Sequence, residues 1–186
     1  MSLSEMLSKI EKTTNNIQKI VTINPDPVIL DGEKEIYNNA AVMVCRATRT
    51  IRAATFRESH AADAPLYWSS LVDHLLAATN ANSPVDYRLV YGYGSRDSVR
   101  TAVAAHRALF KQSGVAGSFH PKFLAGAVGV DLLIVDHTSF MIALPVLSSD
   151  RSVRRAMLIT DADDLVTDVA EWFDNYLWAK ANGAVR

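Results

Sequence analysis

The sequence predicts an α/β protein, and more closely an α/β sandwich built on a mixed sheet. Segments with helical periodicity alternate with short apolar segments of strand length along most of the chain, a pattern typical of α/β folds. The chain has 186 residues, 49% of them hydrophobic, which suits one compact domain with a sizeable core.

Charge and residue usage exclude several classes of function. The 19 basic and 20 acidic residues leave a formal net charge of −1, so no basic excess indicates direct binding to nucleic acid. The single cysteine, Cys45, excludes an internal disulfide and lies in an apolar run, where we expect a buried thiol. The five histidines lack the spacing of common metal sites, so we expect no metal and no cofactor.

Nothing in the sequence predicts a membrane protein. The chain opens on polar and charged residues rather than on a signal peptide, and no apolar run reaches the roughly 20 residues that span a bilayer. We therefore expect a cytoplasmic protein in a reducing environment.

The first 23 residues predict an amphipathic helix that holds a homodimer together. Apolar or small residues recur at alternating intervals of three and four, the rhythm of a coiled-coil seam: Leu3, Met6, Ile10, Thr13, Ile17 and Ile20. About three heptads are short for an isolated coiled coil, so a helix packed on its own domain is an equal alternative. The prolines of "NPDP" then break any helix, and we assign 24–35 to a linker.

The domain proper is expected to span 36–186 and to begin with a helix. Acidic residues around Glu33 and Glu35 favour a helix start, and the apolar segment that follows predicts a helix to about residue 48. Residues 50–58 alternate well enough to be a strand, and 66–81 predict the next helix.

The second half of the domain continues the alternation. We expect a strand at 85–93, a helix at 95–114, and a strand or loop at 115–129 that Pro121 keeps from being a long central strand. The segment "VDLLIVDHTSFMIALP" predicts two strands around a turn, and Asp136 ends the first of them. One more strand at 154–161 and a closing helix from 162 complete the pattern.

The order and spacing of these pieces resemble one half of the phospholipase D superfamily, over roughly Ile36 to Ala181. "RTIRAATF" stands where that superfamily has its first core strand, and "VDLLIVDHTSFMIALP" is similar to its signature hairpin. The closing strand and helix also have counterparts there. The resemblance implies an α/β sandwich of phospholipase D-like type with a mixed sheet.

The catalytic motif of that superfamily is degenerate here. Members that act on phosphodiesters carry H-x-K-x-x-x-x-D, in which the histidine attacks phosphorus and the lysine neutralises phosphate charge. If Asp136 is the motif aspartate, Gly129 takes the place of the histidine and Asp131 that of the lysine. Glycine has no nucleophile and Asp131 would repel phosphate, so the resemblance implies a hairpin without the chemistry.

Catalysis has one remaining set of candidates, His120 and Lys122 in "HPK", together with Asp136. The aspartate that follows Lys122 comes nine residues later instead of five, and Pro121 separates the histidine from the lysine. We expect His120 and Lys122 to be ordinary residues of a loop or edge strand. The alternative is a phosphodiesterase or nuclease that uses His120 and Lys122 across a homodimer.

A ligand site is predicted where the strands end, because ligands of α/β folds bind at the carboxyl ends of strands. These ends carry Arg57, Tyr91, Tyr93 and His137. Aromatic walls with one cation suit a small anionic or aromatic metabolite. Asp136 itself is expected to cap its hairpin turn by accepting backbone N–H groups.

Together, the residues and the resemblance predict a non-enzymatic ligand-sensing and dimerisation module, as part of a signalling or transcription-regulatory protein. Non-enzymatic relatives in that superfamily serve this role behind a DNA-binding head and a coiled-coil linker. The expected partners are a second copy of the chain and a small anionic metabolite, with no membrane and no direct contact to nucleic acid. A phosphodiesterase and a plain structural interaction module are the alternatives.

Overall fold

A computed structural model describes residues 27–56, 64–92, 96–124, 130–143 and 155–182. Within these ranges the chain forms one sheet of seven strands in the order β1-β7-β6-β5-β2-β3-β4. The strands are β1 (Val28–Asp31), β2 (Thr50–Thr55), β3 (Asp86–Tyr91), β4 (Phe119–Phe123), β5 (Asp131–Val135), β6 (Ser139–Ala143) and β7 (Arg155–Thr160).

The sheet is mixed, as the sequence predicts. Strands β2, β3 and β4 run parallel to one another, whereas β5, β6, β7 and β1 continue the sheet from the other side of β2 with antiparallel pairings. The change of direction occurs between β2 and β5, so the carboxyl end of β5 lies beside the amino end of β2.

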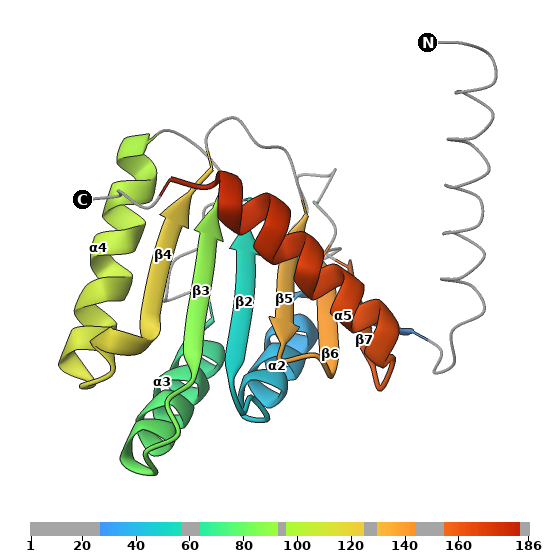
Figure 1. Cartoon of the computed structure of the whole chain (residues 1–186), viewed down its shortest axis with the longest axis horizontal. Coiled ribbons are helices and arrows are strands. Elements are labelled where there is room, and N and C mark those ends of the chain that lie inside the picture. The colour runs from blue at the N-terminus through green and yellow to red at the C-terminus, as the bar shows by residue number, and fades with distance from the viewer. Residues whose placement is uncertain (1–26, 57–63, 93–95, 125–129, 144–154, 183–186) are drawn as a thin grey trace.

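Helices cover both faces of the sheet, which makes the fold an α/β sandwich (Figure 1). One face packs against α2 (Glu33–Val44), α3 (Pro65–Asn80) and α4 (Arg96–Gln112). The opposite face packs against α5 (Asp163–Trp172), which continues into η4 (Phe173–Trp178), a stretch of π-helix. A short 3-10 turn, η2 (Ala116–Ser118), precedes β4.

The two helical layers explain the composition of the central strands. In β2, Ala53 belongs to the core under α2 and α3, whereas Ala54 belongs to the core under α5. A strand buried on both faces needs apolar residues at successive positions rather than in alternation. At the sheet edge, β4 contains Pro121, which fits there because proline has no N–H to donate to a neighbouring strand.

Two expectations from the sequence need correction. Strand β1 and the start of α2 lie inside the segment 24–35 that the sequence assigns to a linker, because β1 pairs with β7 and buries Leu30. Cys45 is exposed rather than buried, because it follows the last residue of α2 and lies off the buried face of that helix.

The predicted dimerising helix, 1–23, falls outside the described residues. Within the described ranges, every helix is too short or too polar to span a bilayer.

Candidate functional site

Asp136 lies in the turn between β5 and β6, directly after β5, and binds backbone from a distant part of the chain. Its Oδ2 accepts hydrogen bonds from the Thr48 N–H (2.7 Å) and the Thr48 hydroxyl (2.9 Å). Its Oδ1 accepts from the N–H groups of Arg49 (2.9 Å) and Thr50 (2.7 Å). The sequence predicts that Asp136 accepts hydrogen bonds from N–H groups of its own turn. The donors are instead residues 48–50, at the entry to β2.

This network keeps the Asp136 carboxyl ionised. Burial acts to raise its pKa, but the hydrogen bonds from Thr50, Thr48 and Arg49 outweigh burial and hold the pKa below its ordinary value of 3.8. The backbone of Asp136 is also unusual, with a φ of 48° that aspartate tolerates better than most residues. The Asp136 carboxylate therefore connects the end of β5 to the start of β2, and both of its oxygens accept hydrogen bonds from residues 48–50.

His120 and Lys122 lie on β4, on the face of the sheet that packs against α5 and η4. The Lys122 Nζ donates to the Trp178 carbonyl oxygen (2.9 Å) and lies 4.2 Å from the centre of the Trp178 ring. The His120 Nε2 is 3.6 Å from an oxygen of Asp86. Strands β2 and β3 separate β4 from β5, so His120 and Lys122 are not brought together with Asp136.

Two of the predicted ligand-binding residues, Arg57 and Tyr93, lie outside the described residues. Tyr91 is buried, at 1% exposure, and its hydroxyl shares a 2.6 Å hydrogen bond with the Nδ1 of His106. His137 is exposed in the turn after β5. Tyr91 and His137 are at opposite ends of the sheet, because β3 runs parallel to β2 whereas β5 runs antiparallel to it.

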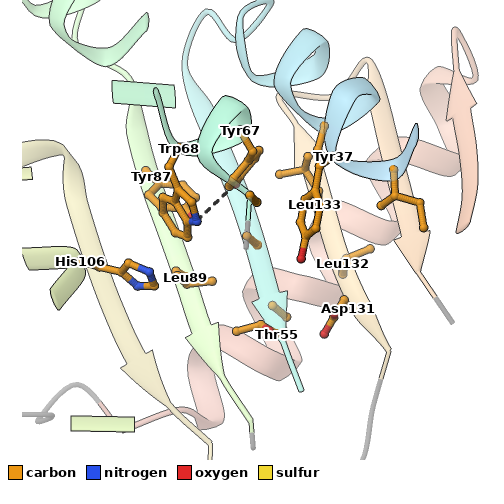
Figure 2. Close-up of a pocket in the computed structure, with 15 residues that line it drawn as sticks. Tyr37, Thr55, Tyr67, Trp68, Tyr87, Leu89, His106, Asp131, Leu132 and Leu133 are labelled. Atoms are coloured by element: carbon orange, nitrogen blue, oxygen red, sulfur yellow. Dashed lines mark hydrogen bonds between the residues drawn. The ribbon is translucent and has the colours of Figure 1, made fainter. Parts of the chain in front are cut away.

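A cavity of about 100 Å³ lies instead between the sheet and the α2, α3 and α4 layer (Figure 2). Its walls come from three helices and three strands, and most of them are aliphatic or aromatic. The lining residues are Ile36, Tyr37, Ala40, Ala53, Ala54, Thr55, Ala64, Tyr67, Trp68, Tyr87, Leu89, His106, Asp131, Leu132 and Leu133. We refer to this cavity as the β2–β5 pocket.

The aromatic wall of the pocket is organised by ring contacts. The ring of Trp68 stacks on His106 at a centroid distance of 4.2 Å and meets Tyr67 edge-on at 5.2 Å. The hydroxyls of Tyr67 and Tyr87 lie 3.3 Å apart. Burial raises the pKa of Tyr67 to about 12, although its hydrogen bond with Tyr87 acts in the opposite direction. The Tyr67 hydroxyl therefore stays uncharged at neutral pH.

Asp131, the first residue of β5, lies at one end of the pocket, beside the carboxyl end of β2. Its Oδ1 accepts a hydrogen bond from the Phe56 N–H (2.8 Å), just beyond the carboxyl end of β2. The resemblance noted in the sequence assigns Asp131 to the position of the phosphate-binding lysine, and this residue lies in the wall of the pocket.

Sequence reasoning missed most of this pocket. Trp68, Tyr67 and His106 occupy ordinary core positions of α3 and α4 in the sequence, and nothing in their spacing distinguishes a wall from a packed core. The one usable signal was Asp131, an acidic residue at the start of an apolar strand in the motif's lysine position.

Among the described residues, no three His, Cys, Asp or Glu side chains are grouped so as to hold a metal ion.

A second polar cluster lies on the opposite face of the sheet. Asp174 of η4 accepts hydrogen bonds from the Arg52 guanidinium, through Nε (3.1 Å) and Nη2 (2.9 Å), and from Arg88 Nη1 (3.1 Å). Arg52 Nη1 also donates to Thr50 Oγ1 (2.8 Å) and to the Asp136 carbonyl oxygen (3.3 Å). Arg52 is thus a buried, ion-paired residue that attaches the last helix to the sheet.

Comparison with known proteins identifies the fold. No protein-family model matches the sequence, and no curated protein matches it. Among solved structures, Nuc from Salmonella typhimurium, a phospholipase D family member, matches 86% of this chain and 99% of its own, with a TM-score of 0.59 and 16% identity. NucT from Helicobacter pylori matches 86% of this chain and 99% of its own, with a TM-score of 0.58 and 11% identity.

A third match extends over almost the whole chain. TrmBL2, described as an archaeal chromatin protein with a novel mode of DNA binding, matches 98% of this chain with a TM-score of 0.58 and 17% identity. This chain spans 65% of the length of TrmBL2. Identities this low establish architecture alone, and the architecture agrees with the sheet and the hairpin described above. The chain has a phospholipase D-like fold.

Proposed function

We propose that this chain is a non-enzymatic ligand-sensing and dimerisation module of a signalling or transcription-regulatory protein. The observation that carries the proposal is the β2–β5 pocket, with its mostly apolar lining and with Asp131 in place of a phosphate-binding lysine. Pockets of this kind, apolar with a few placed polar groups, are the usual sites of small ligands. The fold supports the regulatory part of the proposal, because TrmBL2 combines it with a role described as chromatin protein.

The dimer, the absence of direct nucleic-acid contact and the cytoplasmic location remain predictions from the sequence. The DNA binding described for TrmBL2 makes a direct test of nucleic-acid binding worthwhile, since this chain lacks the basic excess that such binding usually needs. A salt-dependent shift of a DNA fragment by the purified chain would contradict the prediction.

Ligand sensing is tested by a thermal-shift screen with small molecules of all charge types. A compound that binds only the folded state raises the melting temperature by mass action. Ala64→Leu fills the β2–β5 pocket and should abolish the shift, whereas Ala77→Leu adds the same side chain on the exposed face of α3 and should keep it. If no compound of any charge shifts the wild type, the chain is not a sensor and a plain interaction module is the better proposal.

The competing proposal is a phosphodiesterase that uses His120 and Lys122. We expect no hydrolysis of bis-p-nitrophenyl phosphate or DNA. The Lys122 Nζ already donates a hydrogen bond to a main-chain carbonyl, and the Asp136 carboxylate already accepts hydrogen bonds from the backbone of residues 48–50. Turnover that disappears in His120→Ala, with the melting temperature unchanged, would replace our proposal by the competing one.

A further inference from the structure

We infer that an apolar surface beside α5 binds the segment 1–23 of a second copy of the chain. The surface consists of Ile142, Met157 and Ile29, on the α5 side of β6, β7 and β1, and we refer to it as the β1 ledge. The inference rests on the proposed function, that the chain dimerises, and adds the surface that the segment meets.

The β1 ledge is one continuous row of apolar side chains. The strand register pairs Ile142 with Met157 and Met157 with Ile29, and residues directly opposite each other share a face of the sheet. That face belongs to α5, because Ile142 and Met157 pack against the core under this helix. Ile142 and Met157 are half-buried, whereas Ile29 is 58% exposed. The row therefore becomes more exposed toward the edge of the sheet.

Helices cover the two faces of this part of the sheet unequally. On one face α2 contacts β5, β6, β7 and β1, whereas on the other face α5 makes its main strand contacts with β5 and β6. Strands β7 and β1 add about 10 Å of sheet beyond β6, which is about the width of one helix. The described residues thus leave the width of one further helix beside α5.

The flank of α5 that faces the ledge is also apolar. Trp178 lies toward β4, where its ring contacts Lys122. Leu165, Val169 and Trp172 lie on the other flank of the helix, at intervals of four and three residues, and so point away from β4 and toward the ledge. Trp172 is 47% exposed. A helix on the ledge would therefore meet apolar side chains from both the sheet and α5.

The chain itself contains a segment with the matching pattern. Between Leu3 and Ile20, apolar or small residues recur every three or four positions, which places them on one side of a helix. Only residues 24–27 separate the segment 1–23 from the start of β1, and β1 contributes Ile29 to the ledge. An amphipathic helix that lies in an apolar groove is a recurrent mode of recognition.

The linker favours a second copy over the same copy. Pro25 and Pro27 disfavour helical conformation in the residues before them, so the sequence predicts an extended run into β1. Four extended residues cover about 13 Å and carry the segment past the end of β1, away from the ledge of its own copy. Short linkers that cannot turn back favour exchange of an element between protomers. Each copy would then cover the ledge of the other.

The test is Ile29→Asp in the full chain, which places a charge on the ledge and leaves segment 1–23 unchanged. Light scattering over a dilution series measures the dissociation constant of the dimer. We expect this constant to rise at least about tenfold, since burial of a charge in an apolar contact is costly.

Val28→Asp is the matched control. Val28 precedes Ile29 in the same strand and is 54% exposed, but it shares its face with Leu30, which belongs to the core on the α2 side. The control should therefore keep the dissociation constant within about threefold of the wild-type value.

Methyl NMR of mixed dimers tests the contact without a substitution on the ledge. One copy carries labelled methionine methyl groups and the other carries labelled isoleucine methyl groups, so a methionine–isoleucine NOE arises only between copies. We expect the Met157 methyl group to show an NOE to Ile10 or Ile17 of the second copy. This measurement decides the question even if Ile29→Asp fails to fold.

The outcomes separate this inference from the proposed function. If Ile29→Asp weakens the dimer no more than Val28→Asp does, the inference is wrong and the proposed dimer stands, with its interface elsewhere. A wild-type dimer without the Met157 NOE has the same meaning. If the wild type is a monomer, both the inference and the proposed dimerisation fail.

Discussion

The Asp136 carboxylate ties the end of β5 to the start of β2, where the sheet changes from parallel to antiparallel. Both of its oxygens accept two hydrogen bonds, and three of the four donors are backbone N–H groups. These N–H groups belong to residues 48–50, at the entry to β2. A carboxylate is suited to this position because it accepts on both oxygens and donates on neither.

We predict that Asp136→Asn lowers the free energy of unfolding by about 2–4 kcal/mol, because the amide NH₂ would face N–H or O–H donors and leave them unsatisfied. A carboxylate that capped only its own turn would tolerate the change. Urea denaturation measures the effect. Asp161→Asn is the matched control, since Asp161 also has a positive φ, 57°, but is exposed; its effect should stay within about 0.5 kcal/mol.

The same experiment at low pH tests the electrostatic origin of this stability. The folded-state pKa of Asp136 lies below its ordinary value, so the carboxylate contributes stability above that ordinary value and loses it as the pH falls through the folded pKa. The difference between wild type and Asp136→Asn should therefore be largest near pH 7 and shrink at acid pH. A difference that stays constant down to pH 2 would contradict this account.

At the scale of elements, the last helix is joined to the sheet by charge as well as by apolar packing. Phe173 and Leu177 are buried against the sheet, and between them Asp174 receives the guanidinium groups of Arg52 and Arg88. Arg52 is almost fully buried and Asp174 is partly exposed. The π-helical stretch of η4 places both kinds of contact on the face that meets β2 and β3.

We predict that Asp174→Ala lowers the free energy of unfolding by about 2–3 kcal/mol, because it leaves the buried Arg52 guanidinium without its carboxylate. Chemical denaturation followed by tryptophan fluorescence measures it. Asp168→Ala, an exposed position of α5, is the control and should change stability by less than about 0.5 kcal/mol. An equal loss in both variants would show that helix charge, rather than the Arg52 pair, is responsible.

At the scale of the whole molecule, the sequence predicts that segment 1–23 determines the oligomeric state. Its 3-4 spacing of apolar residues predicts a homodimer. Replacing Ile10 and Ile17 by aspartate in the full chain places charges on that seam, and light scattering should then report a monomer where the wild type is a dimer.

The control for the dimer experiment keeps the seam intact. Lys9→Asp with Asn16→Asp adds the same side chains one position away, off the seam, and should leave the dimer in place. A monomeric wild type would refute the prediction. A dimer that survives the Ile10 and Ile17 replacements would place the interface on the domain.

The order of the elements was predictable because it depends on local rules. Helical periodicity identified α3, α4 and α5, and apolar strand-length segments identified β2, β3, β5, β6 and β7. Pro121 predicted that β4 could not be a long central strand, since a residue without an N–H cannot pair on both sides. Strand β1 was missed, because four residues carry too little pattern to distinguish a strand from a linker.

The site was decided by tertiary structure. Periodicity states which face of an element is apolar, but the choice of neighbouring strand depends on packing across the whole chain. The antiparallel pairing of β5 with β2 separated His137 from Tyr91, and gave Asp136 donors 86 to 88 residues away. The sequence by itself determined the α/β order and the hairpin, and its resemblance to the phospholipase D superfamily predicted Gly129 and Asp131 in place of the motif's histidine and lysine. Only the tertiary structure brought Trp68, His106 and Asp131 around one pocket, because they come from three elements that meet through long-range packing alone.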